Sequence, residues 1–154
     1  MTDNNRPCTI RLKFPGDIDY IPPIRKFIAE TLQTVGFDSK FSYRSEIVID
    51  EVCNNAVLFG CTAPESEIEF NFTILDDKVE FIVKDQGGTE LNREKLKVAV
   101  ERKKQDVEAE IKKQRKLGLE IVRMLSEELH FEIDENNLTS VKVVRRRDPI
   151  PAGK

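Results

Sequence analysis

The chain has 154 residues, which is enough for one domain with a sizeable core and too few for two. A formal net charge of -3 argues against nucleic acid or membrane binding by charge alone, and no stretch approaches the length of a membrane span. The three cysteines lack metal-ligand spacing, and the polar N-terminus lacks the apolar run of a signal peptide. These features predict a cytoplasmic protein with free thiols.

The first part of the chain predicts one strand followed by two helices. Residues 9–14 alternate apolar and polar side chains, as a strand does, and a Pro-Gly pair follows them. Residues 22–35 begin with two prolines and repeat apolar side chains at helical spacing up to a glycine that can end a helix. Asp38 is expected to cap a second helix that continues to about Phe59, with Gly60 after it.

The second part predicts a hairpin, a third helix and two closing strands. Residues 68–74 and 79–83 alternate around an Asp-Asp turn, which is typical of an antiparallel hairpin with one buried face. Residues 117–129 carry leucine and valine on one side of a helix. Strands are then expected at 130–134 and 139–145.

Residues 92–115 are mostly Lys, Arg, Glu and Asp, without Gly or Pro. Lys104 and Glu108 are spaced for a helical ion pair, and good helix formers predominate, so the segment predicts a solvated helix. A second interpretation is a mobile lid over a ligand site, because long polar insertions beside a glycine turn often carry function. The two interpretations are compatible, and the lid would span 89–116.

Two polar residues stand on the half of the second helix that is expected to face the core. Glu51 and Asn55 are four residues apart, so their side chains are neighbours, whereas Glu46 and Asp50 are expected to be ordinary surface charges. Either the two side chains form hydrogen bonds with each other and with the backbone at a core edge, or they line a polar pocket. In such a pocket the amide would suit a hard cation, and the carboxylate could act as a base. The apolar residues on the same half are Ile47, Val48, Val52, Ala56, Leu58 and Phe59.

Two glycine-containing segments complete the candidate set. Asp85 ends a strand just before Gly87, which indicates either a plain turn or an acceptor for a ligand amino group beside a glycine that admits a flat ring. Gly118 stands at a helix start, where it either allows tight packing or exposes N–H groups to phosphate. Arg115 and Lys116 just before it would add positive charge.

The order of these features resembles the Bergerat-fold ATPases, the superfamily of histidine kinases, gyrase-type topoisomerases and anti-sigma serine kinases. Residues 51–60, EVCNNAVLFG, are similar to the family's N-box, and residues 117–129, LGLEIVRMLSEEL, are similar to its second glycine box. The resemblance covers nearly the whole chain. We therefore expect an α/β two-layer sandwich, with a mixed, mostly antiparallel sheet and helices on one face, in a domain of residues 1–148 before a loose tail, 149–154.

The resemblance implies a site for ATP and Mg²⁺. Glu51 would be the base that activates a serine hydroxyl of a partner protein, and Asn55 would hold magnesium against the phosphates. Asp85 would accept a hydrogen bond from the adenine amino group. The other residues implied at the nucleotide are Gly87 in the adenine pocket, Lys116, Gly118 and Leu119 at the phosphates, and Thr139 near the base.

The resemblance also implies a role in a regulatory partner switch. An anti-sigma kinase sequesters a sigma factor, and a small anti-anti-sigma protein of the STAS type releases it until that protein is phosphorylated on serine; a homodimer is expected. Phe59, Thr89, Lys116 and Leu138 depart from the family pattern. Phe59, Thr89 and Lys116 motivate a second hypothesis, a module that keeps the fold and sequesters a partner without phosphotransfer. In a third, the charged segment 92–115 is itself the docking surface.

Overall fold

The computed structural model describes residues 7–61, 63–85, 97–98, 118–135 and 138–147. The predicted strand, the first two helices and the hairpin are all confirmed. The elements in chain order are β1 (Cys8–Pro15), the short 3-10 helix η1 (Ile18–Tyr20), α1 (Ile21–Thr34), α2 (Ser39–Gly60), β2 (Glu67–Ile74), β3 (Lys78–Asp85), α5 (Gly118–Leu125), β4 (Glu128–Ile133) and β5 (Thr139–Arg146).

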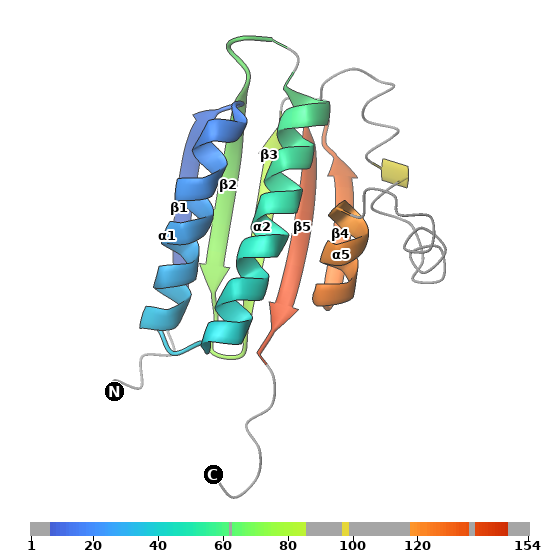
Figure 1. The fold of residues 1–154 in the computed structure, drawn as a ribbon. Helices are drawn as coiled ribbons and strands as arrows, with labels where there is room; N and C mark the ends of the chain where they lie inside the picture. The colour runs from blue at the N-terminus through green and yellow to red at the C-terminus, as the bar shows by residue number, and fades with distance from the viewer. Residues whose placement is uncertain (1–6, 62, 86–96, 99–117, 136–137, 148–154) are drawn as a thin grey trace, which may run out of the picture.

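The five strands form one sheet in the order β1-β2-β3-β5-β4. Every pairing among these strands is antiparallel, so the sheet lacks the parallel pairing that a mixed sheet would contain. Figure 1 shows α1, α2 and α5 side by side on one face of the sheet. The expected α/β sandwich is therefore confirmed. No helix of the described ranges is long and apolar enough to cross a membrane.

The core lies between the sheet and the three helices. Every second residue of β2 and β3 is buried, as the alternation of the sequence predicts. Phe81 stacks on Phe70 and Phe72, with ring centroids 6.0 and 5.4 Å apart. From the helix side, Val48 and Val52 of α2 are fully covered. This packing fixes α2 against the middle of the sheet.

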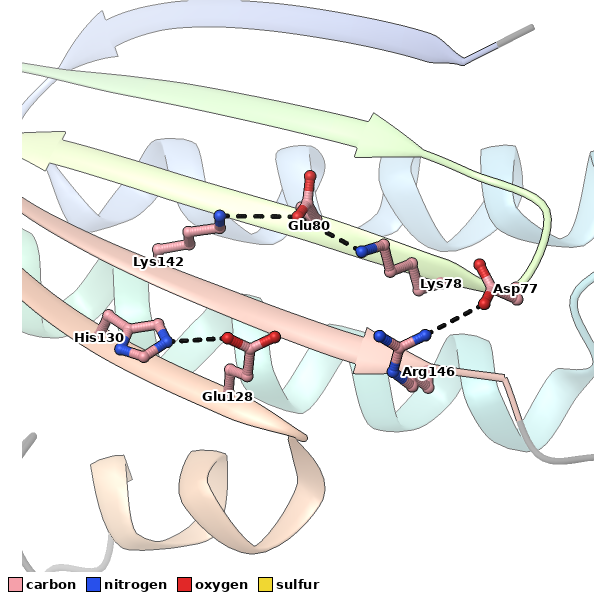
Figure 2. A network of polar contacts seen from close by, with 7 residues as sticks. All are labelled: Asp77, Lys78, Glu80, Glu128, His130, Lys142 and Arg146. Atoms are coloured by element: carbon pink, nitrogen blue, oxygen red, sulfur yellow. Dashed lines mark hydrogen bonds and ion pairs between the residues drawn. The ribbon is translucent and has the colours of Figure 1, made fainter. Parts of the chain in front are cut away.

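The sheet face away from the helices carries charged side chains instead. Figure 2 shows Glu80 between Lys78 and Lys142, with N–O separations of 4.0 and 3.6 Å. On the edge strand β4, the hydrogen bond with His130 holds the pKa of Glu128 below its ordinary value. Partly exposed pairs of this kind contribute little stability each. Their arrangement indicates that the helices cover the only apolar face of the described sheet.

The ends of α1 and α2 follow the signals in the sequence. Prolines occupy the first turn of α1, and Gly36, with a φ of 103°, turns the chain after it. The Asp38 carboxylate accepts a hydrogen bond from the Phe41 amide at 2.7 Å and so caps α2. These caps fix where α2 begins and therefore which of its residues face the sheet.

The predicted third helix was too long. It ends at Leu125, and Leu129 belongs to β4, where it is buried. A leucine at 129 satisfies both the helical spacing and the strand alternation, so the pattern alone cannot separate them. The backbone decides the matter, because the Glu127 amide already donates to the Val144 carbonyl at 2.8 Å.

The buried arc of α2 is centred on a different face from the one predicted. Ile49 and Cys53 are buried, whereas Leu58 is 65% exposed, so its assignment to the core-facing half was wrong. At 100° per residue Leu58 lies almost opposite the buried residues, where neither α1 nor the sheet covers it. Asp50 is not an ordinary surface charge either, because it forms an ion pair with Arg25 of α1.

Candidate functional site

Asp85 and Thr139 meet at the ends of two neighbouring inner strands. They are Cα partners in the pairing of β3 with β5. The alternation that buries Phe81 and Val83 also directs Asp85 toward the helices, and only 4% of its surface is exposed. The Thr139 hydroxyl donates a hydrogen bond to Asp85 Oδ1. The structure therefore holds a carboxylate in a fixed, buried position, where it can accept a hydrogen bond from a ligand amino group.

The last turn of α2 closes over this carboxylate. A side chain at Gly60 would overlap the carboxyl group of Asp85, so only glycine lets the helix end approach so closely. Cys61 follows, and burial together with the negative charge of Asp85 raises the pKa of its thiol to about 11. From the sequence, Gly60 was predicted only as a helix stop. Its place at the end of the N-box-like stretch was the signal that could have revealed this contact.

Glu51 and Asn55 lie outside the buried arc of α2, and both are half-buried. The Asn55 side-chain amide donates to the Glu51 backbone carbonyl at 2.7 Å. This bond uses the amide nitrogen and directs the side-chain carbonyl oxygen away from it. Burial, then the charges of Asp50 and of Glu120 on α5, raise the pKa of the Glu51 carboxyl. A carboxyl with a raised pKa is suited to accept a proton near neutral pH.

Glu51, Asn55 and Gly60 are spread along the last turns of α2. Nine residues separate Glu51 from Gly60, which corresponds to about 13 Å along the helix axis. A raised-pKa carboxyl, an amide oxygen and the buried Asp85 carboxylate thus follow one another along the helix. Their order along the axis matches an elongated ligand with an amino group at one end and a reactive group at the other, while Glu51 and Gly60 lie on opposite sides of the helix.

A groove of about 310 Å³ opens beside Glu51, between α1 and α2. The ion pair between Arg25 and Asp50 joins the two helices there. Arg25 and Tyr43 were not predicted from the sequence, because nothing in a helical pattern indicates which exposed side chains border a neighbouring helix. The residues that line the groove are Arg25, Tyr43, Glu46, Ile47, Asp50 and Glu51.

Some of the predicted site residues are described on α5, and others are not described. Gly118 is the first residue of α5, and the Leu119 side chain is buried, so Leu119 can offer a ligand only its backbone. Gly87 and Lys116 lie outside the described residues. So does the proposed lid, 89–116, apart from residues 97–98, and so does the predicted tail.

The residues present are compatible with a nucleotide and its magnesium ion. Among the described residues, no group of three His, Cys, Asp or Glu side chains could hold a metal by itself. A magnesium ion here would therefore need the phosphate oxygens of a ligand, together with water and the Asn55 carbonyl oxygen, a ligand set that this ion prefers.

Residues 14–145 match the family described as the histidine kinase-like ATPase domain. The match spans most of the chain, and the protein therefore belongs to this family, as the resemblance in its sequence indicated. The chain is similar to the serine-protein kinase RsbW of Bacillus licheniformis, with 24% identity over 94% of this chain and 90% of that protein. For RsbW of Bacillus mycoides, the identity is 27% over 82% and 78% of the two chains.

A solved structure shares the fold. The SiaB-SiaC complex from Pseudomonas aeruginosa contains a chain that superposes with a TM-score of 0.72, at 14% identity and with 88% of each chain covered. This likeness supports the architecture, with helices α1, α2 and α5 on one face of a five-stranded sheet.

Proposed function

We propose that the protein is an ATP-dependent serine kinase that acts as an anti-sigma factor. The observation that carries the proposal is the half-buried Glu51, whose raised pKa and position beside an open groove suit a general base. Membership of the histidine kinase-like ATPase family supports the use of ATP. The similarity to RsbW serine-protein kinases supports a protein serine as the acceptor.

The proposed chemistry assigns one role to each described residue. Asp85, held by Thr139, accepts a hydrogen bond from the adenine amino group, and the N-terminus of α5 at Gly118 faces the phosphates. Glu51 takes the proton of the serine hydroxyl. As it does so, the serine oxygen bonds to the γ-phosphorus, and the bond between that phosphorus and the departing ADP breaks. Magnesium, with Asn55 among its ligands, would neutralise charge on the phosphates.

The proposal extends to partners and organisation. A sigma factor would be sequestered by the kinase in the cytoplasm, and a STAS-type anti-anti-sigma protein would supply the serine. The groove of about 310 Å³ beside Glu51 would receive the serine side chain of such a protein. A homodimer and a lid at 89–116 within the domain 1–148 belong to the same proposal.

The test is phosphotransfer from γ-labelled ATP with Mg²⁺ to the STAS-domain proteins of the source organism, each supplied in turn. We expect one of them to be labelled, and Glu51→Gln to abolish labelling while ATP binding persists. Glu30→Gln, which changes an exposed carboxylate of α1 outside the groove, is the matched control and should retain labelling. Labelling that survives Glu51→Gln would remove Glu51 from its role.

A module that sequesters a partner without phosphotransfer is the second candidate. Phe59 favours it, because a polar residue is usual there in the family, whereas here the side chain packs against the hydrophobic core. This candidate predicts a partner that binds equally well with and without ATP and is never labelled. It also predicts that Asn55→Ala leaves partner binding unchanged.

A further inference from the structure

A second cavity, of about 320 Å³, lies at the opposite end of α2 from Gly60. Three segments form its walls: the first turns of α2, the last turn of α5 with the chain that follows it, and the end of β5. In Figure 1 these segments meet toward the lower end of α2. The lining residues are Lys40, Phe41, Arg44, Met124, Leu125, Ser126, Glu127, Arg145 and Arg146. We call this the basic cavity.

Positive charge predominates in the basic cavity. Its lining includes four cationic side chains and one carboxylate, that of Glu127. Arg146 pairs with Asp77 at 3.1 Å on the outer side of the sheet (Figure 2). Within the described ranges, no carboxylate lies at ion-pair distance from Lys40 or Arg44. The cavity therefore presents an excess of positive charge to a ligand.

Lys40 and Arg44 place positive charge near the N-terminus of α2. Both lie in the first two turns of α2; the Asp38 carboxylate caps the helix just before them, and no acidic residue occupies the first turn itself. The N-terminus of a helix carries partial positive charge, so acidic side chains are favoured there and basic ones are not. Lys40, in the first turn, therefore opposes the stability of the helix, and Arg44 adds positive charge one turn further on. An anion bound between them would compensate for that unfavourable placement.

The floor of the basic cavity is preformed. Arg145 is 5% exposed, and its guanidinium donates to the Leu125 carbonyl at 2.9 Å and to the Phe41 carbonyl at 3.0 Å. The same group lies 4.2 Å from the centroid of the Phe41 ring. Close by, the buried hydroxyl of Ser126 has no hydrogen-bond partner in the described structure. Buried polar atoms are seldom left without a partner, and a small shift of this hydroxyl toward a bound acceptor oxygen would supply one.

We propose that the basic cavity binds a small phosphate-bearing anion. Its volume is that of a small-molecule site. Arginine guanidinium groups suit phosphate because their forked donors match its oxygens, and lysine adds a compact charge. The site is distinct from the candidate nucleotide site, since Arg44 and Glu51 are about two helical turns, or 10 Å, apart along α2. The proposal does not depend on kinase activity.

Calorimetric titration of the purified chain with sodium pyrophosphate, at constant ionic strength, tests the proposal. The double variant Lys40→Gln/Arg44→Gln should bind at least about tenfold more weakly than the wild type. The matched control, Arg11→Gln/Lys26→Gln, removes the same charge from exposed positions of β1 and α1 and should bind as the wild type does. Equal affinity in all three proteins, or equal loss in both variants, would overturn the proposal.

Amide NMR shifts of the wild-type chain locate the bound pyrophosphate without relying on any variant. We expect pyrophosphate to move the amides of Phe41 and Ser126 at concentrations that leave the amides of Glu51 and Asp85 in place. Shifts confined to Glu51 and Asp85 would mean that pyrophosphate occupies only the nucleotide site. That result would refute an anion site in the basic cavity.

Discussion

The hydrogen bond from Thr139 to Asp85 can be removed with little change of shape. Thr139→Val replaces the hydroxyl with a methyl group and keeps a β-branched side chain, so the strand propensity of β5 is nearly preserved. The change leaves the buried Asp85 carboxylate with one donor fewer, although it keeps its other interactions. The loss therefore reports on the contribution of this one bond to the site.

The expected loss is about 2 kcal/mol. A hydrogen bond to a charged group contributes roughly 1.5–3 kcal/mol, and Thr139 is only 1% exposed, so water cannot replace the lost donor. For a chain of this size, each kcal/mol lowers the melting temperature by about 2–4 °C. Thr139→Val should therefore melt about 4–8 °C below the wild type.

Thermal unfolding followed by circular dichroism measures this difference, and Thr73→Val is the matched control. Thr73 is also in a strand, and its hydroxyl meets that of Thr9 at 3.2 Å in an exposed pair. Exposed substitutions usually change stability by less than about 0.5 kcal/mol. If Thr139→Val were no less stable than Thr73→Val, the reasoning about the buried carboxylate would be refuted.

Three further predictions concern α2, α5 and β5. Gly60→Ala places a methyl group against the buried Asp85 carboxylate at the end of β3. Calorimetry should therefore show an ATP affinity at least about tenfold lower for this variant, whereas the control Gly36→Ala should change stability alone. Burial and neighbouring carboxylates raise the pKa of Glu51 in the folded protein, so its ionisation destabilises the fold as the pH rises above 4.5 through the raised value. In urea unfolding, Glu51→Gln should therefore be more stable than the wild type at pH 7 and equally stable near pH 4. Arg145→Leu removes the donors of the Leu125 and Phe41 carbonyls, so its free energy of unfolding in the same assay should fall by about 3 kcal/mol. For the exposed Arg146→Leu the fall should be less than about 0.5 kcal/mol.

Local signals in the sequence were sufficient for most of the fold. Asp38 predicted the start of α2 because a capping carboxylate acts on amides only a few residues away. Strict alternation in residues 68–74 and 79–83 predicted β2 and β3, since a sheet with one apolar face buries every second side chain. The positions of Glu51, Asn55 and Asp85 could likewise be predicted from their elements, although their chemical roles stay predictions.

Contacts between distant elements could not be predicted in the same way. Arg25 and Asp50 form a pair across α1 and α2, and no pattern within either helix indicates it. Arg145 stands near a strand end, where a cation is ordinarily exposed. It is buried here, and its guanidinium donates to the carbonyls of Leu125 in α5 and Phe41 in α2. Leu129 could not be assigned from its pattern either, because helical and strand spacing both fit it. Only the pairing of β4 with β5 places it in a strand.

The most direct test of the central claim is calorimetric titration with ATP and ADP, with and without Mg²⁺, of the wild type and Asp85→Asn. The variant keeps an oxygen that can accept from Thr139, so the fold should survive. We expect wild-type binding that strengthens with Mg²⁺ and an affinity at least about tenfold lower in the variant, because the adenine amino group loses its charged acceptor. No binding by the folded wild type, or equal binding by both proteins, would contradict it.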